Sequence, residues 1–306
     1  MKKRRLGNSD LYVSEIGLGC MSLGTEQAKA EKIIHTALDQ GINYFDTADL
    51  YDFGANEEIV GKALKPVRND IILATKVGNK WNDEQTGWSW DASKAYIKEA
   101  VKASLSRLKT DYIDLYQLHG GTMEDNHEEV IQAFEELIEE GVIRYYGISS
   151  IRPNVIKSFV ADSRLISVMM QYSLLDRRPE EWMPLLTENE TSIIARGPVA
   201  KGLLTDKMLK KATDSIKENG YLQYSYDELS EALTQIQEAF PSRTLQEVAL
   251  QYVLSHPAVG AIIPGASSPE QVIANVKATQ AKPLSDDELQ LLRSLTVADT
   301  YSQHRD

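Results

Sequence analysis

The feature that most constrains the fold of this chain is a regular alternation of short β-rich runs with amphipathic helical stretches. Turn residues bound each run and a helical stretch follows it, an order typical of βα units around a parallel sheet. The candidate strands span residues 16–19, 44–46, 71–76, 112–118, 143–149, 167–171, 192–195 and 260–263. Because eight parallel strands close a barrel, the sequence predicts an α/β fold of the (β/α)8 barrel class.

Helix-start signals support this assignment. Asn126 and Glu129 form the start of a helix whose apolar residues recur at helical spacing until Gly141 ends it. Residues 268–271, Ser-Pro-Glu-Gln, start another helix in the same way, with proline at the first helical position.

The two ends of the chain lie outside the repeat. Residues 4–6 and 13–16 flank a turn-rich segment and predict an amino-terminal β-hairpin. A carboxy-terminal extension follows about residue 284. No linker, low-complexity tract or internal repeat divides the sequence, so a single domain over residues 1–306 is expected.

The composition argues against several classes of protein. The formal net charge is −12 and the isoelectric point is about 5.0, whereas nucleic-acid binding depends on clustered Lys and Arg. The one cysteine, Cys20, argues against a disulfide or a multi-thiolate metal cage. The start MKKRRLGNSD lacks the apolar region of a signal peptide, and no run approaches the roughly 18 apolar residues that span a bilayer. A cytoplasmic protein without nucleic-acid or membrane partners is expected.

Four polar side chains fall near the carboxyl ends of three neighbouring candidate strands, where the active sites of such barrels lie. They are Asp46 and Tyr51 after the second strand, Lys76 at the third and His119 at the fourth. Each has an ordinary alternative: a turn cap, a packing aromatic, a solvated loop charge and a structural histidine. Their joint position at adjacent strand ends favours a catalytic group.

Together these groups suit proton transfer to a carbonyl oxygen. An unperturbed tyrosine has a pKa of about 10, and a nearby ammonium lowers such a pKa because it stabilises the phenolate. Lys76 is the candidate ammonium, and Asp46 would keep it protonated in a buried site. His119 is placed to orient the reacting oxygen beside Tyr51. The sequence therefore predicts Tyr51 as the general acid.

The contexts FDTADLY, LATKV and DLYQLH, which carry these four residues in this order, resemble the catalytic tetrad of the aldo-keto reductase superfamily. Other matching stretches, spread along nearly the whole chain, are 16–21, 147–150, 172–177, 198–205 and 263–271. The resemblance implies a nicotinamide-dependent enzyme without metal, in which hydride passes to an aldehyde or ketone and Tyr51 donates the proton. It assigns Asp46 and Lys76 to tuning of the tyrosine and His119 to orientation of the substrate carbonyl.

Two rival functions are weaker. A regulatory module that keeps the fold and cofactor but turns over little, like the channel-associated members of the superfamily, would not need all four groups. A metal-dependent hydrolase would need clustered ligands, but the five histidines are scattered and no His-x-His pair occurs.

Residues 17–22, Gly-Leu-Gly-Cys-Met-Ser, nearly spell the dinucleotide fingerprint G-x-G-x-x-G of a doubly wound sheet. Ser22 replaces the last glycine, and eight βα units favour the barrel. The resemblance implies instead that Gly19, Cys20 and Met21, together with Asp46, lie near the nicotinamide. The alternative is a tight turn under the hairpin.

The loops after the seventh and eighth strands are the usual phosphate site of such a barrel, because backbone N–H groups gather there at a helix start. The candidate contacts are Gly197, Pro198, Val199, Ala200, Lys201, Gly265, Ser267, Ser268 and Gln271. Ordinary turns are the alternative. The resemblance further implies that Asn275, one helical turn beyond Gln271, faces the adenine.

The nicotinamide contacts depart from the family pattern. Arg196 stands where many members have a tyrosine against the ring, and a guanidinium plane can also stack. Ser149 and Ser150 replace a Ser-Asn pair that holds the carboxamide. Met169 is in register for the glutamine of that group, and Gln171 shares its strand face and is the expected substitute.

The resemblance favours NADPH as cofactor, with NADH as the alternative. No Lys or Arg occurs in 265–271, where members that select the 2′-phosphate often carry one. Ser267, Ser268 and Gln271 can hydrogen-bond a phosphate at the helix start. Gln271 is otherwise only the reciprocal partner in a capping box.

Two further segments bear on the substrate. Residues 77–90 hold three of the four tryptophans, and Trp81 and Trp88 are the candidate wall for an apolar small-molecule carbonyl substrate. The alternative is that they anchor a long loop. Residues 206–240 are long and polar, and are expected to be a cofactor lid or a partly mobile insertion.

Overall fold

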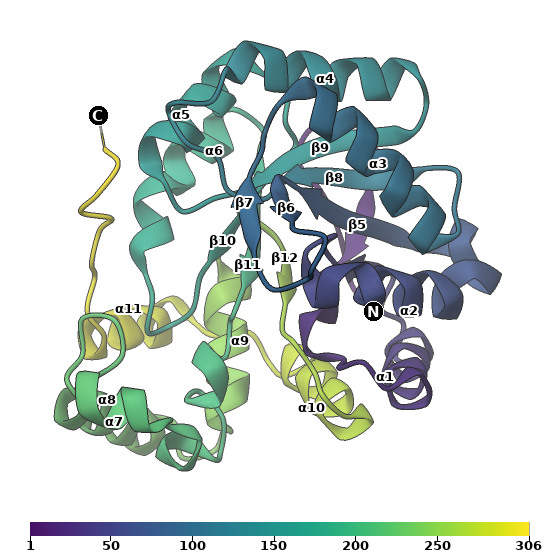
Figure 1. Ribbon diagram of the computed structural model, residues 1–306. Coiled ribbons are helices and arrows are strands. Elements are labelled where there is room, and N and C mark those ends of the chain that lie inside the picture. Colours follow the sequence, from purple (N-terminus) through teal and green to yellow (C-terminus); the bar gives the residue numbers. More distant parts are fainter. Residues whose placement is uncertain (306) are drawn as a thin grey trace.

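The computed structural model describes residues 1–305 and contains eight parallel strands that close into a barrel (Figure 1). The barrel strands are β3 Leu18–Gly19, β4 Tyr44–Asp46, β5 Ile72–Val77, β8 Ile113–Leu118, β9 Ile143–Ser149, β10 Ser167–Gln171, β11 Ser192–Arg196 and β12 Val259–Ile263. These strands pair in chain order, and two isolated parallel bridges, Ile16 with Ile262 and Gly19 with Gly265, join the first strand to the last. The predicted barrel class is confirmed.

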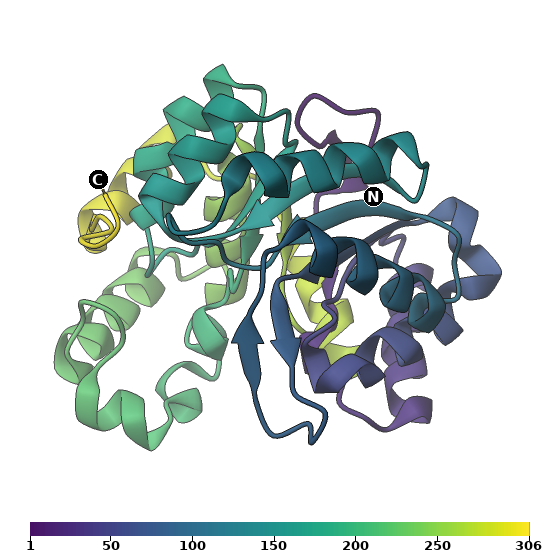
Figure 2. The ribbon, with the colours of Figure 1, turned by 45° about the horizontal axis from the view of Figure 1, so that its top comes forward.

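Helices follow the strands and form the outer layer of the barrel. They are α1 Gln27–Asp39, α2 Ala55–Leu64, α3 Lys94–Leu108, α4 His127–Glu139, α5 Pro153–Asp162, α6 Met183–Glu188, α7 Asp214–Asn219, α8 Tyr226–Ala239, α9 Leu245–Ser255, α10 Pro269–Thr279 and α11 Asp286–Leu295. Figures 1 and 2 show α7 and α8 to one side, near α11. The segment expected as a lid or insertion therefore contains two helices.

The helix starts agree with the sequence in one case and differ in detail in the other. At α4 the Asn126 side chain accepts a hydrogen bond from the Glu129 N–H at 3.2 Å, as expected for a capping residue. At α10 the proline position is as expected, but the Ser268 side chain makes no capping bond. Instead Gln271 Oε1 accepts a hydrogen bond from the Ser267 N–H at 2.8 Å, so this glutamine is used at the helix start.

The predicted amino-terminal hairpin consists of β1 Lys3–Arg5 and β2 Tyr12–Ser14, paired antiparallel. Its apolar residues Leu6, Leu11 and Val13 are buried in a cluster with residues from the barrel strands. Burial of such side chains removes apolar surface from water and is the main favourable term here. The hairpin therefore covers one end of the barrel and leaves the carboxyl ends of the strands, at the other end, as the mouth.

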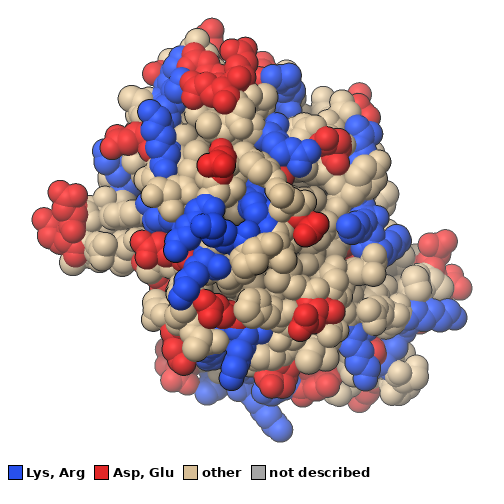
Figure 3. Space-filling model, turned by 90° about the vertical axis from the view of Figure 1, so that its right-hand side faces the viewer, with Lys and Arg blue, Asp and Glu red and all other residues tan. Residues whose placement is uncertain are grey.

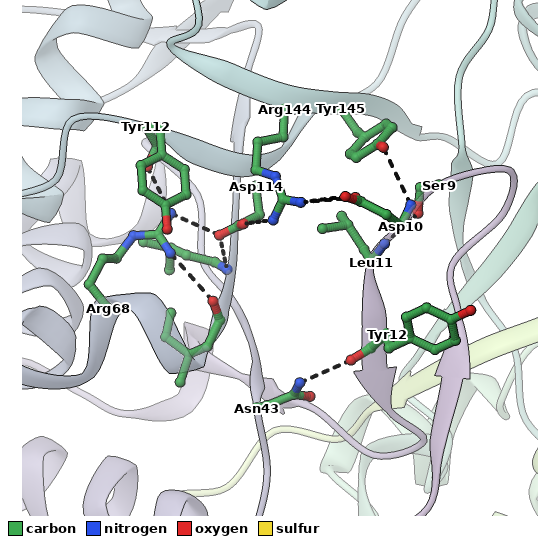
Figure 4. Close-up of polar contacts among 12 residues, drawn as sticks. Ser9, Asp10, Leu11, Tyr12, Asn43, Arg68, Tyr112, Asp114, Arg144 and Tyr145 are labelled. Carbon is green, nitrogen blue, oxygen red and sulfur yellow. Dashed lines mark hydrogen bonds and ion pairs between the residues drawn. The ribbon is translucent and has the colours of Figure 1, made fainter.

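A line of charges ties the hairpin to the barrel (Figure 4). Asp114, which is buried on β8, forms an ion pair with Arg68 at 2.8 Å and accepts a hydrogen bond from Arg144 at 2.9 Å. Its carboxylate also accepts from the Leu73 N–H at 3.0 Å. Arg144 reaches on to Asp10 of the hairpin turn at 2.9 Å, where both side chains are exposed.

The two carboxylates of this line should differ in their effect on stability. Asp114→Asn should lower the free energy of unfolding by about 3 kcal/mol, because it leaves the largely buried Arg68 without its charge partner. Asp10→Asn should lower it by less than about 1 kcal/mol, since the pair is exposed. Urea unfolding of both variants measures the difference, and equal losses would contradict this account.

Residues 77–90, expected as a loop, contain a second hairpin formed by β6 Asn79–Trp81 and β7 Trp88–Trp90. Figure 2 shows it projecting from the barrel beside β5. Its base is held by Trp90, whose Nε1 donates to Asp125 Oδ1 at 2.8 Å. The Trp90 ring leaves no room for a side chain at Gly78, where an added Cβ would lie 2.7 Å from it. The loop expectation is thus corrected.

Acidic and basic side chains are interspersed over the face shown in Figure 3. Ion pairs also link neighbouring helices: Lys98 of α3 lies 2.8 Å from Glu136 of α4 and 2.7 Å from Glu140, the residue after α4. Such exposed pairs contribute little to stability. Within residues 1–305, no helix is long and apolar enough to cross a membrane.

Candidate active site

The centre of the mouth is an ion pair between two fully buried side chains. Asp46 is the last residue of β4 and pairs in register with Ala74 of β5. Lys76, two residues further along β5, points to the same face and brings its Nζ to 2.5 Å from Asp46 Oδ1. The Thr47 carbonyl accepts a second hydrogen bond from this ammonium at 2.6 Å, and the Gln117 amide donates to Asp46 Oδ2 at 2.9 Å.

These partners keep the pair ionised despite its burial. Burial alone lowers the pKa of Lys76, but the Asp46 carboxylate and Tyr51 outweigh it, so this pKa lies above its ordinary value. Burial raises the pKa of Asp46, and Lys76 and Gln117 oppose that rise. A permanent positive charge therefore lies beneath the mouth.

Tyr51 follows β4 at the start of the short helix η2 Tyr51–Gly54. Its hydroxyl oxygen lies 3.4 Å from Lys76 Nζ. The three residues after it are all left-handed, with φ of 49° at Asp52, 51° at Phe53 and 88° at Gly54. Such conformations are costly for residues with a Cβ and persist only where the surroundings enforce them. This turn directs the chain into α2 and leaves the phenol at the mouth.

His119 completes the predicted group. Its N–H donates to the Val77 carbonyl at 2.7 Å, and its ring lies edge-on to the Tyr51 ring with centroids 6.1 Å apart. Burial lowers the pKa of His119 to about 3, and the charges of Lys76 and Arg196 add to that effect. The imidazole is therefore neutral at physiological pH. Its Nδ1 is buried and has no hydrogen-bond partner within residues 1–305.

The depressed pKa of His119 makes a prediction about pH. The unfolded chain binds a proton here near pH 6.5 and the folded protein only near pH 3, so stability is lost as pH falls between these values. His119→Asn should remove this loss and make the stability curve shallower by up to about 1.4 kcal/mol per pH unit. In the folded protein the His119 imidazole NMR signals should not titrate above pH 4. Titration near 6.5 would contradict the assignment.

The first βα turn is close to the catalytic group. Gly19 pairs with Gly265 across the closing bridge, and an added Cβ at Gly19 would lie 3.0 Å from the Ile263 carbonyl. Cys20 is fully buried, with its Sγ donating to the Leu18 carbonyl at 3.6 Å. Met21 is exposed. The turn thus brings its backbone at Gly19 beside Asp46, while the cysteine is buried.

Further round the mouth, Arg196 ends β11 and donates to Gln171 Oε1 at 3.0 Å. These two residues are register partners on β10 and β11. Ser149, the last residue of β9, pairs in register with Met169, which is buried in the barrel interior. Gln171, rather than Met169, therefore presents its amide at the rim beside Arg196.

The turn after β11 is unusual in its backbone. Gly197, Ala200 and Lys201 have φ of 64°, 47° and 57°, and Pro198 and Val199 lie between them. Backbones that mix right- and left-handed residues form concave sites for anions. This turn is therefore suited to a phosphate.

The start of α10 places Gly265, Ser267 and Ser268 beside the closing bridge, with helix N–H groups available for an anion. Gln271 is held by Ser267. Asn275 is buried, and its Oδ1 accepts from Gln246 at 2.5 Å. Both polar side chains therefore have partners within the protein.

The candidate substrate residues differ in their surroundings. Trp81 packs edge-on against Phe53, with ring centroids 6.5 Å apart, and Arg107 lies 5.3 Å from the Trp81 ring. Trp88 is its register partner on β7 but is 57% exposed. Only Trp81 is thus packed beside the turn that carries Tyr51.

Sequence reasoning missed three residues of this site: Thr47, Phe53 and Gln117. Gln117 had a usable signal, because it is a polar residue within a run that otherwise reads as a fully buried strand. Within residues 1–305, no group of three or more His, Cys, Asp or Glu side chains is arranged to hold a metal ion.

Several known proteins are similar to this chain. Residues 15–296 match the Aldo/keto reductase family. The chain is 62% identical over 305 residues to the uncharacterized oxidoreductase YqkF of Bacillus subtilis (strain 168), covering 100% of both. The holo structure of the aldo-keto reductase AKR11C1 from Bacillus halodurans has a TM-score of 0.94 and 59% identity, again covering 100% of both chains. The NADH-specific methylglyoxal reductase of Escherichia coli (strain K12) is 30% identical over 324 residues, covering 97% of this chain and 99% of that protein.

Proposed function

Because the chain belongs to the aldo/keto reductase family, we propose that it is an oxidoreductase that reduces aldehydes or ketones to alcohols with a nicotinamide cofactor. The observation that carries this proposal is the buried Lys76–Asp46 pair with the Tyr51 hydroxyl 3.4 Å from the ammonium. A proton donor, a fixed cation and a neutral imidazole lie close together at the mouth. These are the groups needed to protonate a carbonyl oxygen.

In this mechanism each residue of the site has a separate role. When bound, the reduced nicotinamide supplies the hydride. The Tyr51 hydroxyl donates its proton to the substrate oxygen, and the Lys76 ammonium stabilises the phenolate that remains. Asp46 and the Thr47 carbonyl hold that ammonium in place. The neutral His119 ring hydrogen-bonds the substrate oxygen and sets its angle to Tyr51.

We propose that the mouth binds a dinucleotide. Arg196 and Gln171 lie at the rim on the side of His119, and the charge of Arg196 is close enough to lower the pKa of that histidine. The left-handed turn at 197–201 and the start of α10 supply backbone donors for phosphates. In this proposal Arg196 and Gln171 hold the nicotinamide end, and these two loops hold the diphosphate and the adenosine.

The rival is a cofactor-binding regulatory module with little turnover. A protein that only binds would gain nothing from a buried lysine aimed at a tyrosine hydroxyl, because burial of the two charges is costly in itself. The arrangement of Asp46, Tyr51 and Lys76 therefore favours an enzyme.

Removing the phenolic hydroxyl tests the mechanism. Tyr51→Phe should lower kcat for a reactive aldehyde by about 10²–10⁴-fold, the usual contribution of general acid catalysis, and leave the cofactor dissociation constant within about twofold. Tyr145→Phe, whose hydroxyl contacts Asp10 at the far end of the barrel, is the control and should keep wild-type rates. Wild-type turnover by Tyr51→Phe would refute the assigned role.

Cofactor preference is a separate test. We propose NADPH as cofactor with NADH also accepted, because Ser267 and Ser268 offer hydroxyl groups near α10 but no cation lies in 265–271. Ser267→Arg should lower the KM for NADPH by about tenfold through a charge-assisted contact and leave that for NADH unchanged. Ser267→Gln, similar in length but neutral, is the control. If Ser267→Arg leaves the ratio unchanged, the 2′-phosphate is not bound at this helix start.

A further inference from the structure

We propose that Tyr301, in the carboxy-terminal extension, is a positioning residue for the cofactor. It acts through Arg178 and Asp176 on the Gln171–Arg196 pair at the rim of the mouth. The inference rests on the proposed function, because that proposal assigns Gln171 and Arg196 to the nicotinamide.

The extension is held to the body of the protein at several points. After α11 the chain runs past α6 towards α5 (Figure 1). The Val297 N–H donates to the Tyr224 hydroxyl at 2.8 Å, and the His304 carbonyl accepts from the Asn154 N–H at 2.8 Å. Arg305 pairs with Glu181. These anchors fix the path on which Tyr301 lies.

Tyr301 is nearly fully buried and its ring covers a guanidinium. Arg178 Cζ lies 4.6 Å from the ring centroid. The Arg178 guanidinium also donates two hydrogen bonds of 2.7 Å to the Asp176 carboxylate. An aromatic face against a guanidinium gains cation–π attraction and keeps water from the ion pair. The ring therefore helps to hold Arg178 in its bidentate geometry.

The contact continues from Asp176 to the mouth. Asp176 is fully buried, and its Oδ2 accepts from Gln171 Nε2 at 3.0 Å. This bond fixes which end of the Gln171 amide faces outward. Gln171 Oε1 then accepts from Arg196 Nη1 at 3.0 Å. The line Tyr301–Arg178–Asp176–Gln171–Arg196 thus joins the extension to the rim through consecutive polar contacts.

The ring, rather than the hydroxyl, carries this effect. The Tyr301 hydroxyl oxygen is buried and has no hydrogen-bond partner within residues 1–305. Loss of the ring exposes Arg178 to water and weakens its hydrogen bonds to Asp176. The Gln171 amide and the Arg196 guanidinium then lose their fixed orientation, and a cofactor that binds them must order them first. Such ordering weakens binding without altering the chemical step.

The experiment compares variants of Tyr301 in the full-length protein. Dissociation constants for NADPH and NADH are measured by quenching of tryptophan fluorescence, and kcat is measured at saturating cofactor with one reactive aldehyde. Tyr301→Ala should raise the dissociation constant about tenfold while kcat stays within about threefold. Tyr301→Phe should restore wild-type affinity. Thr300→Ala, which truncates the exposed side chain next to Tyr301 in the sequence but keeps the ring, is the control and should bind like the wild type.

A second variant and a double mutant exclude a merely structural effect. Tyr301→Leu keeps part of the apolar volume without an aromatic face and should weaken binding like Tyr301→Ala, in a variant that a urea titration shows to be folded. Adding Gln171→Leu to Tyr301→Leu should weaken cofactor binding little further, because the effects of substitutions at directly coupled residues on binding free energy are not additive.

The outcomes separate the two proposals. A wild-type protein that binds neither cofactor and reduces no aldehyde defeats the proposed function. A wild type that binds cofactor, with a folded Tyr301→Leu variant of equal affinity, overturns the role of Tyr301. Additive effects of Tyr301→Leu and Gln171→Leu overturn it as well.

Discussion

The buried pair of Lys76 and Asp46 is the interaction on which the rest of the mouth depends. Two charges removed from water are stable only if nearly all their hydrogen-bonding capacity is used. Here the ammonium has the Asp46 carboxylate and the Thr47 carbonyl, and the carboxylate also has Gln117. The contacts draw on three neighbouring strands and the segment after β4, so the barrel must be assembled before the pair is satisfied. The charge beside Tyr51 is consequently fixed before any substrate arrives, which is how preorganised sites avoid reorganisation during reaction.

Much of the fold could be predicted because local patterns determine it. The strands 44–46, 143–149 and 167–171 have the expected bounds, since short apolar runs between turn residues have few other stable arrangements in a folded domain. The carboxyl ends of parallel strands share one face of a barrel. Sequence position alone therefore placed Asp46 and Lys76 side by side, and the structure brings them into contact.

What could not be predicted depends on contacts between distant parts of the chain. Gln117 donates to Asp46 across 71 residues, and Arg177 reaches the Thr296 carbonyl across 119. No periodicity reports such pairs. The hairpin of β6 and β7 was missed because its short strands are mostly exposed and contain polar residues, so no apolar run marks them. Asn275 accepts a hydrogen bond from Gln246, a contact that only the packing of α9 on α10 reveals.

The strands of the barrel are not paired equally well around its whole circumference. Elsewhere neighbouring strands are paired over two or more residues, but the first and last are joined by the isolated bridges at Ile16 and Gly19. This seam runs up to the mouth between two of the loops proposed to touch the cofactor. A molecule that contacts both Gly19 and Gly265 would link the first and last strands at the joint where only isolated bridges pair them. The bound cofactor would then also stabilise the closure of the barrel, because it would add contacts across the joint between the first and last strands.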